Sequence, residues 1–158
     1  MEITVHLTIP GQQTAIPHLR HWLREVLTGW EVSNECTWDL LLAITEICTN
    51  IIRHGYNHQL AGEITVQLAK RGPTIYTTIC DTAPTFIPRH IMPPPPEMLA
   101  EGGYGLFLIG ALMDEIVFER DDGYVNRTIL IKHDPSMPYP MKRQTALEPG
   151  WRRGCMPQ

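Results

Sequence analysis

Residues 40–56 read LLLAITEICTNIIRHGY, and this stretch decides the fold that the sequence predicts. At about 100° per residue, a helix that has Glu46 at the origin carries Asn50 at about 40° and His54 at about 80°. The opposite arc is apolar, and Leu42 is the one apolar residue outside it. That arc comprises Leu40, Leu41, Ile44, Ile47, Cys48, Ile51 and Ile52. The spacing predicts an amphipathic helix with a wide buried stripe.

The polar side of this helix carries a carboxylate, a carboxamide and an imidazole in a row. A helix side that only faced water would more often show paired Lys and Glu residues. The row therefore favours the floor of a site, although a solvated face stays open on periodicity alone. Gly55, which follows His54, is expected in the left-handed position that ends the helix.

Hydrophobic periodicity divides the rest of the chain into short elements. Strands are predicted over 2–9, 62–70, 74–80, 115–120 and 124–133, and further helices over 16–27 and after the glycine cluster 102–105. Ser33 or Asn34 is expected to cap the long helix. Mostly antiparallel strands with three helices on one face define an α+β fold, a two-layer α/β sandwich.

Composition indicates one domain over residues 1–134, followed by a Pro-rich, flexible tail over 135–158. The net charge of −4 gives no basic footprint for nucleic acid. No window is long and apolar enough to span a membrane, so a cytoplasmic protein is expected. Cys48 and Cys80 fall in apolar patterns and are expected to be reduced core residues.

Three patches suggest nucleotide chemistry if they meet over one end of the sheet. Gly102–Gly105 opens a helix whose free N–H groups suit phosphates. Asn50 offers an oxygen suited to Mg²⁺, and Glu46 is able to accept a proton. Asp81, directly after a strand, is able to accept a hydrogen bond from an exocyclic amino group. Each patch also has a plainer explanation, as a turn, a helix entry or a solvated face.

The motif EICTNIIRHGY resembles the N-box of the GHKL nucleotide-binding superfamily. With the later D-x-A, EGGYGLFLIGALMDEIVF and NRTILIK segments, the pattern is similar to the bacterial anti-sigma-factor serine kinases, the sigma-B regulator kinase among them. The resemblance covers about residues 2–133 and implies the Bergerat fold, with ATP or ADP and Mg²⁺ bound under a lid, here residues 84–101.

The same resemblance implies roles for individual residues. Glu46 is the general base, Asn50 the Mg²⁺ ligand, and Asp81 the acceptor for the adenine amino group. The other residues implied at the nucleotide are His54 as part of the site wall, Arg53, Ala83, the turn residues Gly103, Tyr104, Gly105 and Leu106, and Thr128 in support of Asp81.

The sequence departs from the family pattern in two places. Ala83 replaces the glycine expected two residues after the adenine-binding Asp, which takes backbone freedom and room from the loop. Residues 90–119 contain no Lys or Arg, so phosphate charge is left to Mg²⁺, backbone amides, Arg53 or Arg89.

Three functions follow from these observations. The first is a serine/threonine kinase that phosphorylates an anti-sigma-factor antagonist and binds a sigma factor, without direct contact to nucleic acid or membrane; relatives commonly dimerise, which leaves a homodimer open. The alternative is a non-catalytic, nucleotide-gated module that sequesters its partner. The third is a zinc site of His54 and His58 with Glu46 or His90, which Gly55 disfavours because it should end the helix before His58.

Overall fold

A computed structural model describes residues 1–57, 62–84 and 105–138 of the chain, with side chains excepted at 105 and 106. The predicted lid at 84–101, apart from its first residue, lies outside the described residues, as do Gly103 and Tyr104. The tail predicted from residue 135 is described only as far as 138. Within that part Ser136 donates to Asp134 Oδ1 and Met137 packs on the core, so both belong to the packed domain.

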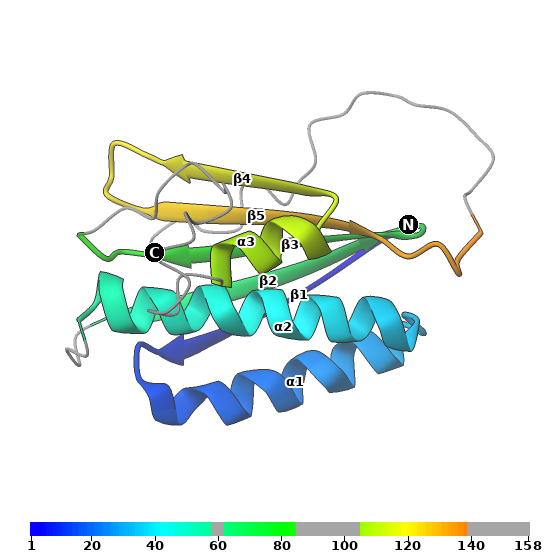
Figure 1. Ribbon diagram of the computed structural model, residues 1–158, viewed down its shortest axis with the longest axis horizontal. Helices are drawn as coiled ribbons and strands as arrows, with labels where there is room; N and C mark the ends of the chain where they lie inside the picture. The colour runs from blue at the N-terminus through cyan, green and yellow to red at the C-terminus, as the bar shows by residue number, and fades with distance from the viewer. Residues whose placement is uncertain (58–61, 85–104, 139–158) are drawn as a thin grey trace.

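The described strands form a five-stranded sheet in the order β1-β2-β3-β5-β4 (Figure 1). All neighbouring pairs are antiparallel. The strands are β1 (Glu2–Pro10), β2 (Glu63–Arg71), β3 (Thr74–Asp81), β4 (Glu115–Arg120) and β5 (Asn126–His133). Gly72 takes a φ of 57° in the predicted β2–β3 turn, a conformation that favours glycine.

The helices α1 (Ile16–Gly29), α2 (Asn34–Asn50) and α3 (Gly105–Leu112) cover one face of the sheet (Figure 1). A short 3₁₀ turn, Gln13–Ala15, leads into α1. The core lies between the two layers, where strand residues such as Ile64 and Leu68 meet α2. The predicted α+β sandwich is therefore confirmed. None of the described helices is long and apolar enough to cross a membrane.

The predicted amphipathic pattern of α2 is also confirmed. Its apolar stripe is buried, with Leu40, Ile44 and Ile47 fully enclosed, while Leu42 is 50% exposed. Ser33 caps the helix, because its Oγ accepts a hydrogen bond from the Cys36 N–H at 3.3 Å. The apolar stripe therefore orients the whole helix on the sheet.

The end of the long helix differs from the prediction. After Asn50 the chain makes a π-helical turn over Ile51–Gly55, closed by a bond of 2.8 Å from the Tyr56 N–H to the Ile51 carbonyl. The left-handed residue is Asn57, with a φ of 50°, and Gly55 has an ordinary φ. The π turn moves the left-handed position two residues along the chain, from Gly55 to Asn57. The prediction that Gly55 takes the left-handed conformation was therefore wrong.

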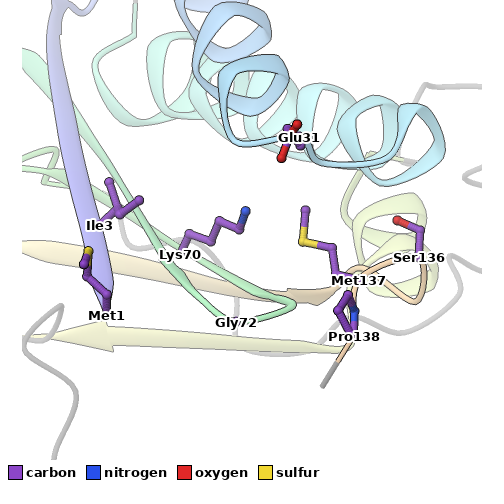
Figure 2. Close-up of a pocket in the computed structure, with 8 residues that line it drawn as sticks. All are labelled: Met1, Ile3, Glu31, Lys70, Gly72, Ser136, Met137 and Pro138. Atoms are coloured by element: carbon purple, nitrogen blue, oxygen red, sulfur yellow. The ribbon is translucent and has the colours of Figure 1, made fainter. Parts of the chain in front are cut away.

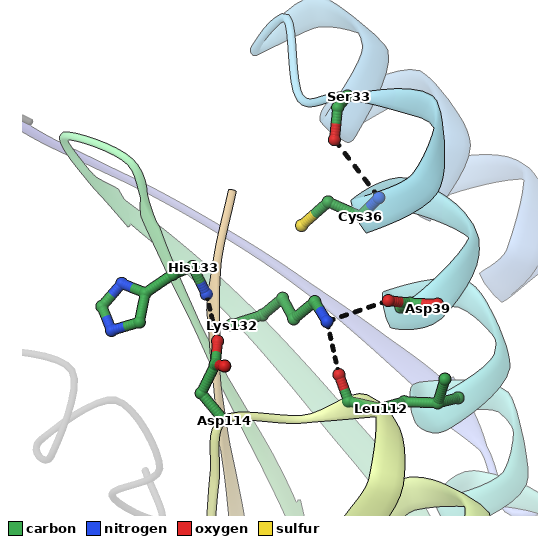
Figure 3. A network of polar contacts seen from close by, with 7 residues as sticks. All are labelled: Ser33, Cys36, Asp39, Leu112, Asp114, Lys132 and His133. Atoms are coloured by element: carbon green, nitrogen blue, oxygen red, sulfur yellow. Dashed lines mark hydrogen bonds and ion pairs between the residues drawn. The ribbon is translucent and has the colours of Figure 1, made fainter. Parts of the chain in front are cut away.

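Polar contacts at one end of the sheet tie the helices to β5 (Figure 3). Lys132 Nζ lies 2.8 Å from Asp39 Oδ2 of α2 and donates at 2.5 Å to the Leu112 carbonyl of α3. The Asp114 carboxylate accepts from the His133 N–H at 2.6 Å. One lysine thus neutralises an α2 carboxylate and satisfies a carbonyl at the C-terminal end of α3.

The prediction of reduced core cysteines holds for one of the two positions. Cys48 is free and fully buried, and burial raises the pKa of its thiol. Cys80 is disulfide-bonded instead. It follows Ile79 on β3, and alternation along the strand turns it to the sheet face away from the helices.

Candidate functional site

The candidate site lies at the end of the sheet opposite the Lys132 contacts. The C-terminal end of α2, the end of β3, the start of β5 and the start of α3 meet there (Figure 1). Asp81, the last residue of β3, pairs across the ladder with Asn126, the first residue of β5. The chain therefore brings the polar row on α2, the residues after β3 and the start of α3 to the same end of the domain.

Asp81 is a buried carboxylate, 4% exposed, on the sheet face that the helices cover. Its Oδ1 accepts hydrogen bonds of 2.8 Å from the Ala83 N–H and from Asn126 Nδ2. None of the hydrogen bonds among the described residues uses Oδ2. Burial raises the pKa of Asp81, and the bonds from Asn126 and Ala83 and the charge of Arg120 oppose that rise. One acceptor oxygen therefore stays available in a site of low polarity.

Asn126 and Arg120 extend this network, and the sequence analysis assigned no role to either, although Asn126 begins the NRTILIK segment. Asn126 Nδ2 also donates to the Ala83 carbonyl at 2.9 Å, and its Oδ1 accepts from Arg120 Nη1 at 3.2 Å. The same guanidinium nitrogen donates to the Pro84 carbonyl at 3.3 Å. These contacts fix both Asp81 and the loop that follows it. The contact between Asn126 and Asp81 follows from the β3–β5 register, because the two residues are 45 positions apart along the chain.

Thr128 faces the helices from β5, opposite Ile79 of β3. The resemblance assigns it the support of Asp81, but no hydrogen bond between described residues joins the two side chains. The direct bond to Asp81 comes from Asn126 instead. Thr128 is buried, and its hydroxyl takes part in none of the described hydrogen bonds, so it remains available to a ligand.

The Ala83 methyl group is accommodated by a glycine on the facing helix turn. A Cβ added to Gly55 would lie 2.8 Å from the Ala83 Cβ, closer than real Cβ contacts. Ala83 is buried, and its φ is not positive. The departure from the family pattern therefore needs no strained backbone, because the methyl group fills the space that Gly55 leaves.

Tyr56 ties the end of the helix to the same loop. Its hydroxyl donates to the Glu63 carbonyl at 2.6 Å and accepts from the Thr82 N–H at 3.0 Å. Its ring lies over Gly62, where an added Cβ would come within 2.1 Å of it. Tyr56 belongs to the motif that the sequence singled out, but its burial and hydroxyl contacts were not predicted.

Glu46 and Asn50 are half-buried on α2. Glu46 is seven residues from Asp39, and this spacing keeps both on nearly the same side of the helix, the side that meets α3 through Lys132. The side chains of Glu46 and Asn50 enter no hydrogen bond or ion pair between described residues. Neither side chain is therefore engaged by a partner in the part of the chain that the structure describes.

His54 and Arg53 are exposed and lie in the π-helical turn. The π turn changes the angular spacing of these residues after Asn50, and the place of His54 in the wall of the site stays a prediction. His58 and His90, the other histidines of the zinc hypothesis, lie outside the described residues. No group of three potential metal ligands occurs within the described part of the chain.

The phosphate-facing turn is described only in part. Gly105 is the first residue of α3 and Leu106 the second, while Gly103 and Tyr104 fall outside the description. Helix α3 starts at the same end of the domain as Asp81 (Figure 1). Its free N–H groups and positive dipole end therefore lie at the end where the other candidate residues gather.

A separate hollow of about 390 Å³ lies at the other end of the domain (Figure 2). It is lined by Met1, Ile3, Glu31, Lys70, Gly72, Ser136, Met137 and Pro138. Lys70 is already engaged, because its Nζ donates to the Trp30 carbonyl at 2.5 Å. This hollow lacks the free polar row of the other end and is not the candidate site.

An α+β sandwich with a buried acidic residue at a strand end and an Asn-bearing helix over the sheet is the arrangement expected of the GHKL nucleotide-binding domains that the sequence resembles. The family model described as a histidine kinase-like ATPase domain matches residues 9–132. The chain belongs to this family.

Known proteins similar to this chain share the name serine-protein kinase RsbW. The serine-protein kinase RsbW of Oceanobacillus iheyensis is 32% identical over 127 residues, which cover 75% of this chain and 80% of that protein. The serine-protein kinase RsbW of Bacillus velezensis is 26% identical over 131 residues, covering 75% of this chain and 79% of that protein.

A solved structure supports the fold. The crystal structure of the RsbU and RsbW domains of a Mycobacterium tuberculosis protein superposes with a TM-score of 0.61 at 22% identity. The match covers 83% of this chain and 32% of that longer chain.

The contact between Gly55 and Ala83 can be tested by exchanging the two residue types. Gly55→Ala is expected to destabilise the fold by about 1–3 kcal/mol through overpacking. Adding Ala83→Gly should restore most of this loss, as measured by urea unfolding. Gly29→Ala is the control, because nothing lies within 4 Å of a Cβ there. A double variant as unstable as Gly55→Ala alone would contradict the contact.

Asp81→Asn should raise the free energy of unfolding at pH 7. The raised pKa of Asp81 means that the ionised carboxylate destabilises the fold above that pKa, and that this cost vanishes below its ordinary value of 3.8. The difference in the free energy of unfolding between variant and wild type should therefore shrink as the pH falls from 7 toward 4. Urea unfolding across this range measures it, and a variant less stable than wild type at pH 7 would refute it.

Proposed function

We propose that this protein is an ATP-dependent serine/threonine kinase of the partner-switching type. It transfers the γ-phosphoryl group of ATP to a hydroxyl of an anti-sigma-factor antagonist and binds a sigma factor as its other partner. The observation that carries the proposal is the pair Glu46 and Asn50, half-buried and without side-chain partners among the described residues, at the same end of the domain as Asp81. The similarity to serine-protein kinases named RsbW supports it.

Asp81 is the residue proposed to select the base. Its free Oδ2 is an acceptor, and a carboxylate accepts from the exocyclic amino group of adenine. Low exposure strengthens such a hydrogen bond, because water does not compete for the oxygen. The start of α3 offers backbone N–H groups to the phosphates, at positions that include Gly105.

Asn50 is proposed to hold Mg²⁺. Its amide oxygen fits a hard cation that keeps several waters and bridges phosphates, and no described hydrogen bond engages this side chain. When bound, Mg²⁺ neutralises charge on the phosphates. Its contribution matters here because residues 90–119 supply no Lys or Arg.

Glu46 is proposed as the general base. One turn before Asn50, its carboxylate accepts the proton of the substrate hydroxyl while the hydroxyl oxygen forms its bond to the γ-phosphorus and ADP leaves. Since its carboxylate has no ion-pair partner among the described residues, no internal cation has to be displaced before the proton is accepted. Arg53 and His54, both exposed, are proposed to line the rim of the site.

Glu46→Gln should abolish phosphate transfer while ATP affinity changes little. Protein, MgATP and the candidate antagonist are incubated, and label on the antagonist is measured; a general base contributes about 10²–10⁴-fold. Glu35→Gln, an exposed change at the start of the same helix, is the control. Labelling by Glu46→Gln at the wild-type rate would reject the base assignment. Wild type that binds ATP but labels no partner would favour the non-catalytic, nucleotide-gated module.

Asn50→Ala should remove most of the dependence of ATP affinity on Mg²⁺. Titration calorimetry with and without Mg²⁺ compares it with wild type and with Asn34→Ala, an exposed position at the far end of α2. Wild type and Asn34→Ala should bind ATP more tightly when Mg²⁺ is present. If Asn50→Ala gains as much affinity from Mg²⁺ as they do, Asn50 is not the ligand.

A further inference from the structure

The contacts around Asp81 determine which of its two oxygens a ligand meets. Oδ1 receives two hydrogen bonds, from Asn126 Nδ2 and the Ala83 N–H, each 2.8 Å long. Oδ2 receives none from the described residues. A carboxylate held through one oxygen presents the other in a fixed direction, and Asn126 supplies the only side-chain N–H among these donors.

The orientation of the Asn126 amide is set by its own neighbours. Both of its N–H groups have acceptors, Asp81 Oδ1 and the Ala83 carbonyl, while its Oδ1 faces the Arg120 guanidinium at 3.2 Å. A flipped amide would place its oxygen against a carboxylate and a carbonyl and its N–H₂ against a cation. Since Asn126 is only 5% exposed, water cannot replace these partners at low cost.

We propose that Asn126 is a positioning residue for base selection, which holds Asp81 so that the site takes 6-amino purine nucleotides and rejects 6-oxo ones. The inference rests on the proposed function. A fixed, ionised carboxylate oxygen accepts from an amino group, whereas an oxo group would place lone pairs against it. A protonated carboxyl also donates to an oxo group, and a carboxylate free to rotate no longer holds its oxygen against the base, so the discrimination is lost in both cases.

The groups around Asp81 differ in how strongly they favour its ionised form. Burial raises the pKa of Asp81, and the hydrogen bond from Asn126 is the largest influence that lowers it, ahead of the Ala83 N–H and of Arg120 on β4. Cys48, which faces Asp81 from α2, has a raised thiol pKa and stays neutral. Loss of Asn126 therefore brings the titration of Asp81 closer to neutral pH.

The test is the ratio of MgATP to MgGTP affinity, measured by calorimetry on the full chain between pH 6 and 8. Wild type should prefer ATP with a nearly constant ratio. Asn126→Ala should lower the ratio about tenfold, the size of one hydrogen bond to a charged group, and further as the pH falls. A merely structural defect would weaken both nucleotides alike and leave the ratio unchanged. Asn34→Ala is the matched control.

Arg120→Met provides a second variant in case Asn126→Ala fails to fold, since Arg120 is exposed. It frees the Asn126 amide to turn and should lower the ratio in the same direction by a smaller factor. If the folded variants keep the wild-type ratio of MgATP to MgGTP affinity at every pH, the inference about Asn126 is overturned, but the proposed kinase function is not. Wild type that binds neither nucleotide would end both.

Discussion

The burial of one side of α2 against the sheet is the constraint on which the rest of the structure depends. Leu40, Ile44 and Ile47, with Ile51 of the following π turn, lose almost all contact with water, and each such side chain contributes about 1.5–3 kcal/mol. This burial fixes the rotation of the helix about its own axis. Once the apolar stripe is inside, Glu46 and Asn50 must lie outside it, near the side of α2 that carries Asp39. The direction of the polar row is therefore a consequence of core packing.

Polar groups at the two ends of the sheet differ in whether other residues of the chain satisfy them. At one end Lys132 and Lys70 satisfy helix carbonyls, and Asp134 accepts from the Ser33 N–H at 2.6 Å, so charge there locks the two layers together. At the other end, within the residues that the structure describes, one oxygen of the buried Asp81 carboxylate and the side chains of Glu46 and Asn50 have no hydrogen-bond partner. Unsatisfied, partly buried polar groups cost stability unless a ligand meets them, which is typical of functional sites. The fold is held at one end and left open to a ligand at the other.

The departure at Ala83 shows how a local sequence rule is met by tertiary compensation. A methyl group at a position where the resemblance leads one to expect glycine suggests strain, but Ala83 has an ordinary φ, and Gly55 on the opposite turn leaves the necessary space. The π-helical turn before Tyr56 brings this glycine to the loop. The second departure, the absence of Lys and Arg over 90–119, has no such compensation among the described contacts, and the proposed mechanism therefore relies on Mg²⁺ and backbone N–H groups.

The sequence by itself determined the element order, the antiparallel sheet, the cap at Ser33 and the buried stripe of α2, because these follow from local periodicity and capping chemistry. It also indicated Glu46, Asn50 and Asp81 as candidates, since they stand at recognisable positions of one helix and one strand. Only the tertiary structure decided the rest. Asn126 meets Asp81 through strand register, and Gly55 meets Ala83 through a π turn that α-helical spacing cannot foresee. Such contacts join residues far apart in the chain, and no local pattern encodes them.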